Sequence, residues 1–184
     1  LLDIIRYKQH LAGTKIGCRE GDCGACTALV GELKNDRVEY RSMTSCLLAL
    51  ANVQGKHIVT VEGLNMDKLS PVQQALVDES GTQCGFCTPG IVVRLSALRA
   101  KGTAVSDHGA VERALQAHLC RCTGWQTIVE AWDQLDQPPA ERDLDAASRR
   151  ATIEGGAPQT VAPAIAEGSG GFADDTAPER SLVA

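Results

Sequence analysis

The sequence is poor in aromatic residues and in long apolar runs. Phe, Trp and Tyr together make up 3% of its 184 residues, which leaves no platform on which the bases of a single-stranded nucleic acid stack. The formal net charge is −5, so the chain as a whole offers no basic field to a phosphate backbone. No apolar stretch approaches the ~20 residues of a membrane-spanning helix. Composition therefore argues against nucleic acid binding and against a membrane span.

The chain does not lack apolar residues overall. Hydrophobic residues make up 43% of the 184 positions, which is enough to bury one or two cores without covalent cross-links. The usual reason for a high density of disulfides is therefore missing. Cysteines that stay reduced in large number favour a reducing compartment, so we expect a cytoplasmic protein.

The cysteines are the most informative feature, because there are eight of them and they fall into two groups of four. Their order along the chain is Cys18, Cys23, Cys26 and Cys46, then Cys84, Cys87, Cys120 and Cys122. Four thiolates saturate one iron–sulfur cluster. The sequence therefore predicts two clusters and a role in electron transfer.

The first group has the spacing C-x4-C-x2-C followed by a distant fourth cysteine, which is typical of plant-type [2Fe–2S] sites. A loop around an anionic cluster turns backbone N–H groups toward the sulfurs, and some of its residues then need a positive φ angle. Gly17, Gly21 and Gly24 lie among these cysteines and adopt such angles at little cost. We interpret this group as one [2Fe–2S] site.

Other uses of the same cysteines are open on the sequence alone. A structural zinc site usually pairs two short C-x2-C motifs, whereas the first group would crowd three ligands of one tetrahedron into a single loop. Eight is an even number, so disulfide pairing is compatible with the count. A Rieske-type site needs two His ligands, and we interpret all four histidines as structural residues outside these loops; they are His10, His57, His108 and His118.

The second group is built from two similar segments. Each has two cysteines, then Thr88 or Thr123, then Pro and/or Gly, and then an apolar run with helical spacing. We expect each Thr to cap a helix, with Pro89 in the first turn, where its missing N–H costs little. The unpaired N–H groups at a helix start favour an anionic ligand. Two such starts facing each other across a pseudo-twofold axis would hold one cluster between them.

These motifs resemble the iron–sulfur subunit or domain of the molybdenum hydroxylases, the family of xanthine dehydrogenase, aldehyde oxidoreductase and carbon monoxide dehydrogenase. The matching stretches are residues 17–27, 45–47, 60–64, 83–90 and 120–124. The resemblance implies an α+β fold. A plant-type ferredoxin-like (β-grasp) domain would span residues 1–66 and a four-helix-bundle domain residues 67–136, each binding one [2Fe–2S] cluster through its own four cysteines.

The resemblance also implies a division of labour among subunits. A large molybdopterin-binding subunit would oxidise the substrate, and an FAD-binding medium subunit would accept the electrons. This chain, not catalytic on its own, would relay single electrons from molybdenum through both clusters to FAD, in a heterotrimer whose dimerisation is left open. Gln83 and Cys122 match family positions whose side chains approach molybdopterin. The motifs look most similar to xanthine dehydrogenases, with aldehyde, N-heterocycle and carbon monoxide dehydrogenases as alternatives.

Two parts of the chain depart from the family pattern. Family members begin with a β-hairpin ahead of the helix that we predict at residues 1–11, so we expect this hairpin to be absent or cut off here. Residues 137–184 hold five of the seven prolines and show little apolar periodicity, so they bury too little surface to offset the entropy of ordering. We expect an extended or disordered tail, or one laid over partner subunits.

Local patterns predict the remaining elements. β-branched and apolar runs predict strands at 27–33, 38–41 and 57–61, the first two joined by a polar turn at 34–36. Ser70 and Gln73 form a capping-box pattern at the first of four helices, predicted at 71–79, 89–101, 107–119 and 124–135. Short connections favour an antiparallel bundle. Trp125 and Trp132, seven residues apart, are predicted to share a face in the core or at a subunit interface.

Two functions of other classes also fit the cysteines. A free-standing soluble electron carrier would purify without a molybdopterin protein. A zinc-binding scaffold protein would be colourless, whereas [2Fe–2S] proteins are red-brown. Arg121 lies between two cysteines, where its charge would tune a cluster's potential or pair with a carboxylate.

Overall fold

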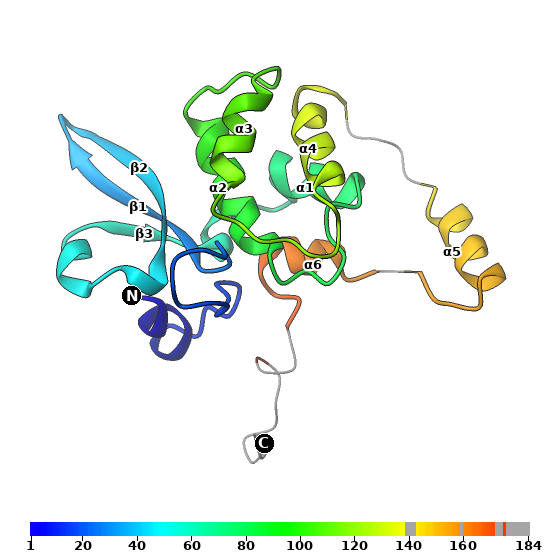
Figure 1. Cartoon of the computed structure of the whole chain (residues 1–184), viewed down its shortest axis with the longest axis horizontal. Helices are drawn as coiled ribbons and strands as arrows, with labels where there is room; N and C mark the ends of the chain where they lie inside the picture. Colours follow the sequence, from blue (N-terminus) through cyan, green and yellow to red (C-terminus); the bar gives the residue numbers. More distant parts are fainter. Residues whose placement is uncertain (139–142, 159, 172–174, 176–184) are drawn as a thin grey trace, which may run out of the picture.

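The computed structural model describes residues 1–138, 143–158 and 160–171 together with Asp175. A small sheet, formed by the N-terminal part of the chain, lies beside a group of helices formed by the part that follows (Figure 1). Within the described ranges, every helix is too short or too polar to cross a bilayer. The two cysteine groups fall on either side of the junction between sheet and helices.

The sheet has three antiparallel strands in the order β2-β1-β3, with bounds Thr27–Lys34 (β1), Arg37–Thr44 (β2) and His57–Val59 (β3). Asn35 and Asp36 connect the first two strands with φ angles of 47° and 60°. A two-residue hairpin turn with both φ angles positive is the type whose twist matches the strands, and Asn and Asp tolerate it. The predicted hairpin is confirmed at this turn.

The N-terminal segment forms a shorter helix than predicted. Instead of an amphipathic helix over residues 1–11, a single wide π-helical turn, η1, covers Ile4–Lys8. His10, with φ of 55°, turns the chain out of the helix soon afterwards. Leu2 and Ile5 of this segment are buried.

Four helices follow the sheet, with bounds Pro71–Asp78 (α1), Thr88–Ala100 (α2), His108–Leu115 (α3) and Gln126–Asp133 (α4). The predicted capping box of α1 is present: Ser70 N donates to Gln73 Oε1 at 2.8 Å, and Gln73 N donates to Ser70 Oγ at 3.4 Å. α2 stops before Gly102, whose φ of 76° ends the helix. Short 3-10 turns lie at Ser45–Leu47 (η2), Leu50–Val53 (η3), Val61–Leu64 (η4) and Gln134–Asp136 (η5).

The third helix ends four residues before the predicted boundary at Leu119. Its start is as expected, because Asp107 Oδ1 accepts a hydrogen bond from Ala110 N at 2.9 Å. After Leu115 the chain leaves the helix and turns inward, so that His118 is 4% exposed. The end of α3 is thus set by a contact with the first domain, which helical periodicity does not encode.

The helices share one apolar core. α1 contacts α2 and α4, and α3 also contacts α2 and α4. Its fully buried large side chains are Leu76, Ile91, Leu95, Ile128 and Trp132, and each stabilises the fold by roughly 1.5–3 kcal/mol relative to exposure. The ring N–H of Trp132 donates a hydrogen bond to Val105 O at 3.1 Å. The two tryptophans therefore differ, because Trp125 is only half-buried.

The sheet and the helices meet at α2, which contacts β1 and β2. Gly90 makes this contact possible, because a Cβ at that position would lie 2.3 Å from the carbonyl oxygen of Gly24. Any larger residue would push the helix away from the loop that carries the first three cysteines. Backbone-to-backbone contact thus fixes the two halves against each other.

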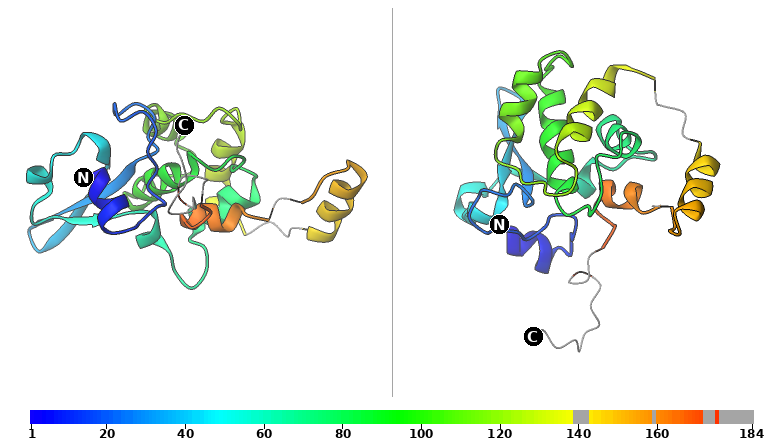
Figure 2. Two further views of the ribbon diagram at one scale, coloured as in Figure 1. Left: turned by 90° about the horizontal axis from the view of Figure 1, so that it is seen from below. Right: turned by 45° about the vertical axis from the view of Figure 1, so that its right-hand side comes forward.

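The C-terminal segment is more ordered than predicted. It contains α5 (Leu144–Ile153), which stands apart from the body in all views, and α6 (Ala162–Glu167), which packs on α1 and α2 (Figures 1 and 2). Gln73 Nε2 donates to Ala166 O at 3.1 Å, and Lys15 Nζ pairs with Asp175 Oδ2 at 2.6 Å. The segment therefore joins both halves of the molecule. The rest of the tail predicted at 137–184 lies outside the described residues.

Candidate metal centres

The first cysteine group is assembled by the β1–β2 hairpin. Cys26 immediately precedes β1 and Cys46 follows β2, and the register pairs Thr27 with Thr44. Ser45 continues this pairing: its N–H and its hydroxyl both donate to Cys26 O, at 3.1 and 2.8 Å. Strand pairing thus brings the distant fourth cysteine to the loop that carries the other three.

Backbone N–H groups of this loop point at sulfur. Cys18 N donates to Cys23 Sγ at 3.4 Å, Cys23 N donates to Cys18 Sγ at 3.4 Å, and Glu20 N donates to Cys18 Sγ at 3.3 Å. The amides of Glu20 and Cys23 lower the pKa of Cys18 to about 7. Gly21 turns the loop with a φ of 90°, and a Cβ on Gly17 would lie 2.6 Å from Cys23 Sγ. The loop is built to stabilise thiolates.

The fourth thiol experiences the charge of the others. Burial and the neighbouring thiols of Cys26 and Cys18 together raise the pKa of Cys46 to about 11, against a lowering by the Gly21 amide. Ionising all four would place like charges side by side, which is unfavourable without a compensating cation. Four clustered thiols with inward N–H groups fit an iron–sulfur cluster, whose irons supply that positive charge.

The second group comes from two loops that precede helices. Cys87 is buried directly before α2, while Cys84 and Cys122 are exposed. Burial raises the pKa of Cys84, and so do the nearby thiols of Cys122 and Cys120. Burial also raises the pKa of Cys87, with a contribution from Cys120. The structure therefore brings together the four cysteines of this group as it does those of the first.

The predicted helix caps of the second group are wrong. Thr88 is the first residue of α2, and its hydroxyl contacts Thr82 Oγ1 at 3.2 Å instead of capping the helix. Thr123 lies before α4 and contacts Cys120 Sγ with its hydroxyl at 3.0 Å. Burial alone would raise the pKa of Cys120, but hydrogen bonds with the hydroxyl and amide of Thr123, the Cys122 amide and the Cys87 thiol outweigh it and lower the pKa. The Thr123 hydroxyl thus contacts the sulfur, and it also accepts a hydrogen bond from Trp125 N at 3.3 Å, just before α4.

Neither group is cross-linked by a disulfide in the structure. All eight cysteines are free thiols. Among the described residues, no three His, Cys, Asp or Glu side chains are grouped closely enough to hold one metal ion. A structural zinc ion would need four ligands about 2.0–2.3 Å from one centre. A cluster with two irons spreads its four thiolate ligands over two metal atoms.

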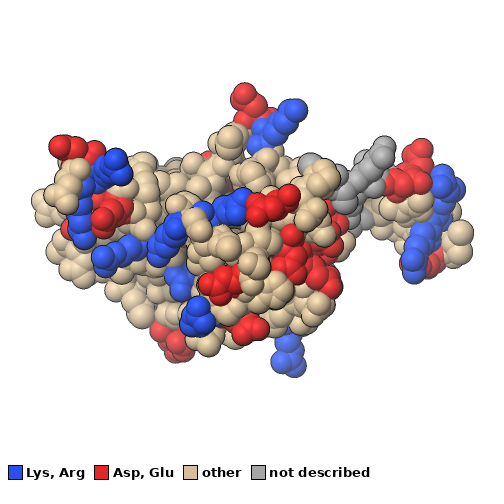
Figure 3. All heavy atoms as spheres, turned by 90° about the horizontal axis from the view of Figure 1, so that it is seen from above, with Lys and Arg blue, Asp and Glu red and all other residues tan. Residues whose placement is uncertain are grey.

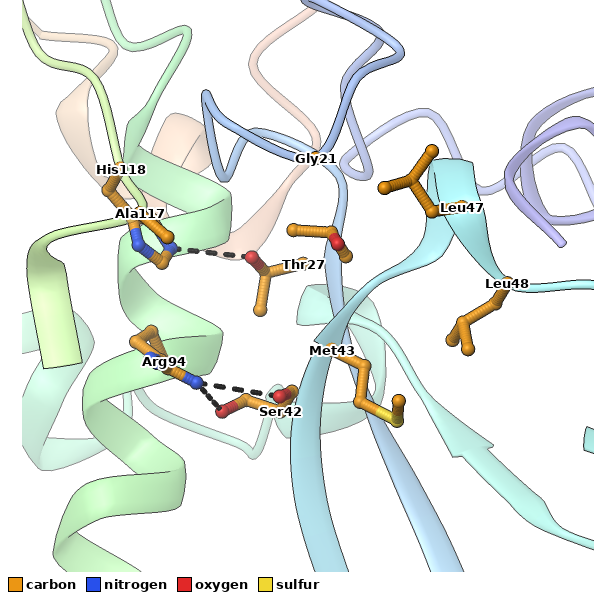
Figure 4. A pocket seen from close by; sticks show the side chains of 10 residues that line it. Gly21, Thr27, Ser42, Met43, Leu47, Leu48, Arg94, Ala117 and His118 are labelled. Atoms are coloured by element: carbon orange, nitrogen blue, oxygen red, sulfur yellow. Dashed lines mark hydrogen bonds between the residues drawn. The ribbon is translucent and has the colours of Figure 1, made fainter.

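The two groups are connected through the end of α3. Leu119 N donates to the carbonyl of Cys23 at 3.0 Å, so a residue next to Cys120 touches a member of the first group. Beside it, His118 Nε2 lies 3.3 Å from Thr27 Oγ1 (Figure 4). Burial, together with the charge of Arg94, lowers the pKa of His118 to about 4, which leaves the ring neutral at pH 7.

Sequence reasoning missed His118 as a residue of this junction. It was grouped with the surface or partly buried histidines, and only its place two positions before Cys120 hinted at more. His57, by contrast, is exposed and contacts the Tyr40 hydroxyl at 2.6 Å. Gln83 and Arg121, singled out beside the second group, are both exposed.

Two family models match the chain. The one described as a 2Fe-2S iron-sulfur cluster binding domain matches residues 1–51. The one described as a [2Fe-2S] binding domain matches residues 60–133. Each matched range contains one of the two cysteine groups.

The curated relatives are much longer than this chain. Xanthine dehydrogenase from Emericella nidulans is 44% identical over 131 residues, covering 70% of this chain and 10% of that protein. Xanthine dehydrogenase from Blastobotrys adeninivorans is 38% identical over 178 residues, covering 95% of this chain and 12% of that protein. The chain thus spans about a tenth of the length of these relatives.

Solved structures agree with the sequence matches. Aldehyde oxidoreductase from Desulfovibrio gigas superposes with a TM-score of 0.76 at 28% identity, over 95% of this chain and 19% of that chain. Quinoline 2-oxidoreductase from Pseudomonas putida 86 gives a TM-score of 0.63 at 33% identity, over 76% of this chain and 85% of the matched one. With both cysteine groups inside matched [2Fe–2S] domains, the chain belongs to the iron–sulfur subunits of the molybdenum hydroxylase family, the family of xanthine dehydrogenase.

Proposed function

We propose that the chain is the electron-transfer subunit of a molybdopterin-dependent hydroxylase and that each cysteine group binds one [2Fe–2S] cluster. The observation that carries this proposal is the sorting of eight free thiols into two groups, joined by the hydrogen bond from Leu119 N to Cys23 O. A bound [2Fe–2S] cluster supplies one-electron redox chemistry. The chain supplies the ligands and the environment.

The residues around the sulfurs have distinct tasks in this proposal. The amides of Glu20 and Cys23 stabilise thiolate charge in the first group, and the hydroxyl of Thr123 does so in the second. Hydrogen bonds to sulfur and solvent exposure set cluster potentials. The contact between Leu119 and Cys23 keeps the two sites close and their spacing fixed.

The proposed partners are a molybdopterin-binding subunit and an FAD-binding subunit, in a heterotrimer. Cys84 and Cys122 are exposed, and Gln83 next to them is exposed as well. An open edge of this kind suits contact with a cofactor held by another subunit, so we propose that Gln83 and Cys122 approach molybdopterin. Electrons would then leave from the first group toward FAD.

The names of the relatives support a proposal for the substrate class. Those named xanthine dehydrogenase are 38–44% identical to the chain, so we propose oxidation of a purine by the complex. A second candidate is an N-heterocycle such as quinoline, because the chain covers 85% of one chain of quinoline 2-oxidoreductase. That match also supports a separate iron–sulfur subunit.

The proposal is tested on the purified complex. Iron and sulfide analysis should give two [2Fe–2S] clusters per chain, and EPR of the reduced protein should show two distinct signals. Anaerobic addition of xanthine should bleach the visible absorption. In the Cys122→Ser variant we expect one EPR signal and no flavin reduction by substrate. Zinc in place of iron, or an unchanged pair of signals in this variant, would contradict the proposal.

A further inference from the structure

Two adjoining hollows form a groove between β2 on one side and α2 and α3 on the other. The first, of about 440 Å³, is bounded by Met43 and Leu47 near the first cysteine group and reaches Arg94 on α2 (Figure 4). The second, of about 290 Å³, continues from Arg94 to Lys101 and Arg113. We call this surface the β2–α2 groove. Its two ends differ in chemistry.

The far end of the groove is cationic. Arg94, Lys101 and Arg113 line the second hollow, and no Asp or Glu does. Figure 3 shows Lys and Arg side chains on the upper face of the molecule, between the β-hairpin side and the helices, with Asp and Glu side chains beside them. The chain as a whole carries a net charge of −5, so a hollow lined by three cations has the opposite sign to the overall charge.

These cations have no carboxylate partner within the described part of the chain. Arg94 is held by neutral acceptors: its Nε donates to Ala114 O at 2.7 Å and its Nη1 donates to Ser42 O at 3.4 Å and to the Ser42 hydroxyl. Such bonds fix the guanidinium without cancelling its charge. Elsewhere on the surface, Lys34 has carboxylates within 4 Å. A half-buried, uncompensated cation is costly, and burial accordingly lowers the pKa of Arg94.

The near end of the groove is apolar and borders the first cysteine group. Leu47 follows Cys46 directly and is 61% exposed, and Met43 is 39% exposed. Large apolar side chains next to a proposed redox centre, at the rim of a hollow, are typical of a contact surface. The groove therefore combines an apolar anchor point with a row of cations.

We propose that the β2–α2 groove binds an acidic segment of a partner protein, with an apolar side chain against Met43 and Leu47 and carboxylates toward Lys101 and Arg113. Charge complementarity speeds and orients such docking. The partner is taken to be the protein that accepts electrons from the first site, and in this respect the inference rests on the proposed function. Binding is measured without electron transfer, so a failure of this inference is distinguishable from a failure of the proposed function.

The test uses the full chain loaded with its clusters and a fluorescein-labelled peptide in which two leucines precede six glutamates. Fluorescence anisotropy is read at low ionic strength, where screening is weak. The variant Lys101→Glu/Arg113→Glu reverses the cationic end. The matched control Lys8→Glu/Lys68→Glu makes the same change in net charge at two exposed lysines outside the groove. Arg94 is left intact because it bridges β2 and α3.

We expect the unmodified chain to bind the peptide, the groove variant to bind at least tenfold more weakly, and the control to stay within about twofold. Leu47→Ser should also weaken binding, while visible absorption stays unchanged in all variants. Absence of binding, or equal losses in both double variants, would overturn the inference. Equal binding of a peptide without leucines would also overturn it. The same holds if a single-stranded oligonucleotide of the same charge binds equally well and its binding is lost in the groove variant, because the groove would then be a general polyanion site.

Discussion

The two cysteine groups solve the same problem with different parts of the backbone. In the first, a glycine-rich loop directs three N–H groups at the sulfurs of Cys18 and Cys23. In the second, the thiols lie at the entrances of two helices, where the hydroxyl of Thr123 lies 3.0 Å from Cys120 Sγ and the amides of Phe86 and Thr123 lower the pKa of Cys84 and Cys120, respectively. The first group thus relies on amides within one loop, whereas the second adds a side-chain hydroxyl.

The groups also differ in exposure: Cys84 and Cys122 of the second group are exposed, whereas the cysteines of the first are buried or half-buried. Each group contains thiols of both kinds. In the first, backbone amides lower the pKa of Cys18 to about 7, while burial and neighbouring thiols raise that of Cys46 to about 11. In the second, hydrogen bonds with Thr123 help to lower the pKa of Cys120, while burial raises that of Cys84 and Cys87. The first site is thus enclosed by its own loop, and the second presents an edge at the surface.

The largest expected effect comes from removing one buried ligand from each group. Cys26→Ser should abolish the first cluster and Cys87→Ser the second, so each variant should keep about half of the iron, because four thiolates are needed per cluster. Iron analysis and EPR check this result. Loss of both signals from either single variant would show that the two sites do not assemble independently.

Asp175→Asn should destabilise the first site more than the second. Asp175 pairs with Lys15 at 2.6 Å and with Arg6, and all three side chains are less than one tenth exposed. Removing one partner of a buried ion pair leaves uncompensated charge and costs about 3–5 kcal/mol. Thermal unfolding and the rate of cluster loss from each site, read by EPR, measure the effect.

The control for this variant is Asp143→Asn. Asp143 lies 3.7 Å from Arg149, with both side chains about two thirds exposed, and an exposed pair contributes roughly 0–1 kcal/mol. Asn also keeps the cap that Asp143 provides to Ala146 N. Equal destabilisation by the two variants would argue against a special role for Asp175.

Gly90→Ala should weaken the contact between α2 and the loop that carries the first three cysteines. Its Cβ would meet the Gly24 carbonyl at 2.3 Å, and overpacking of this kind costs about 1–3 kcal/mol, although Ala alone favours a helix. Gly109→Ala in α3 is the control, because its nearest neighbour is the flexible end of Arg113 at 3.1 Å. Denaturant unfolding should show a loss for the first variant and none for the second.

The smallest expected effect concerns the potential of the second cluster. Thr123→Val removes the hydroxyl that lies 3.0 Å from Cys120 Sγ, and hydrogen bonds to sulfur favour the reduced, more negative state. We expect the second cluster to reduce at a lower potential while the first is unchanged. EPR-monitored redox titration measures both, with Thr152→Val on α5 as the control. A shift of the first signal would contradict the assignment of Thr123 to the second site.

Much of the local structure was predictable because it depends on neighbours in the sequence. The hairpin turn at Asn35 and Asp36 and the capping box of Ser70 and Gln73 are short-range patterns, and the structure confirms both. The caps expected from Thr88 and Thr123 were wrong. The Thr88 hydroxyl contacts Thr82 instead of a backbone amide, and the Thr123 hydroxyl contacts Cys120 Sγ as well as the Trp125 amide; which partners a hydroxyl finds depends on tertiary packing.

The end of α3 and the structure of the C-terminal segment were harder to predict, because both depend on tertiary packing. α3 ends at Leu115 because the following residues turn toward the first domain, and apolar periodicity carries no information about that contact. The proline-rich segment lacked an amphipathic signal, yet α6 buries Ala162, Ile165 and Ala166 against helices far away in the sequence. A short apolar stretch packs as a helix only where the fold presents a complementary apolar surface.

The sequence by itself indicated the chemistry, because eight cysteines sort by their spacing into two groups of four, a pattern typical of two [2Fe–2S] sites. Only the tertiary structure decided how these sites relate to each other. Leu119 bonds to Cys23, Gly90 approaches Gly24, and His118 is buried at their junction, which unites residues far apart in the sequence. Ligand identity is a local property of the residues, whereas distance, exposure and the groove beside Arg94 arise only when separate elements pack together.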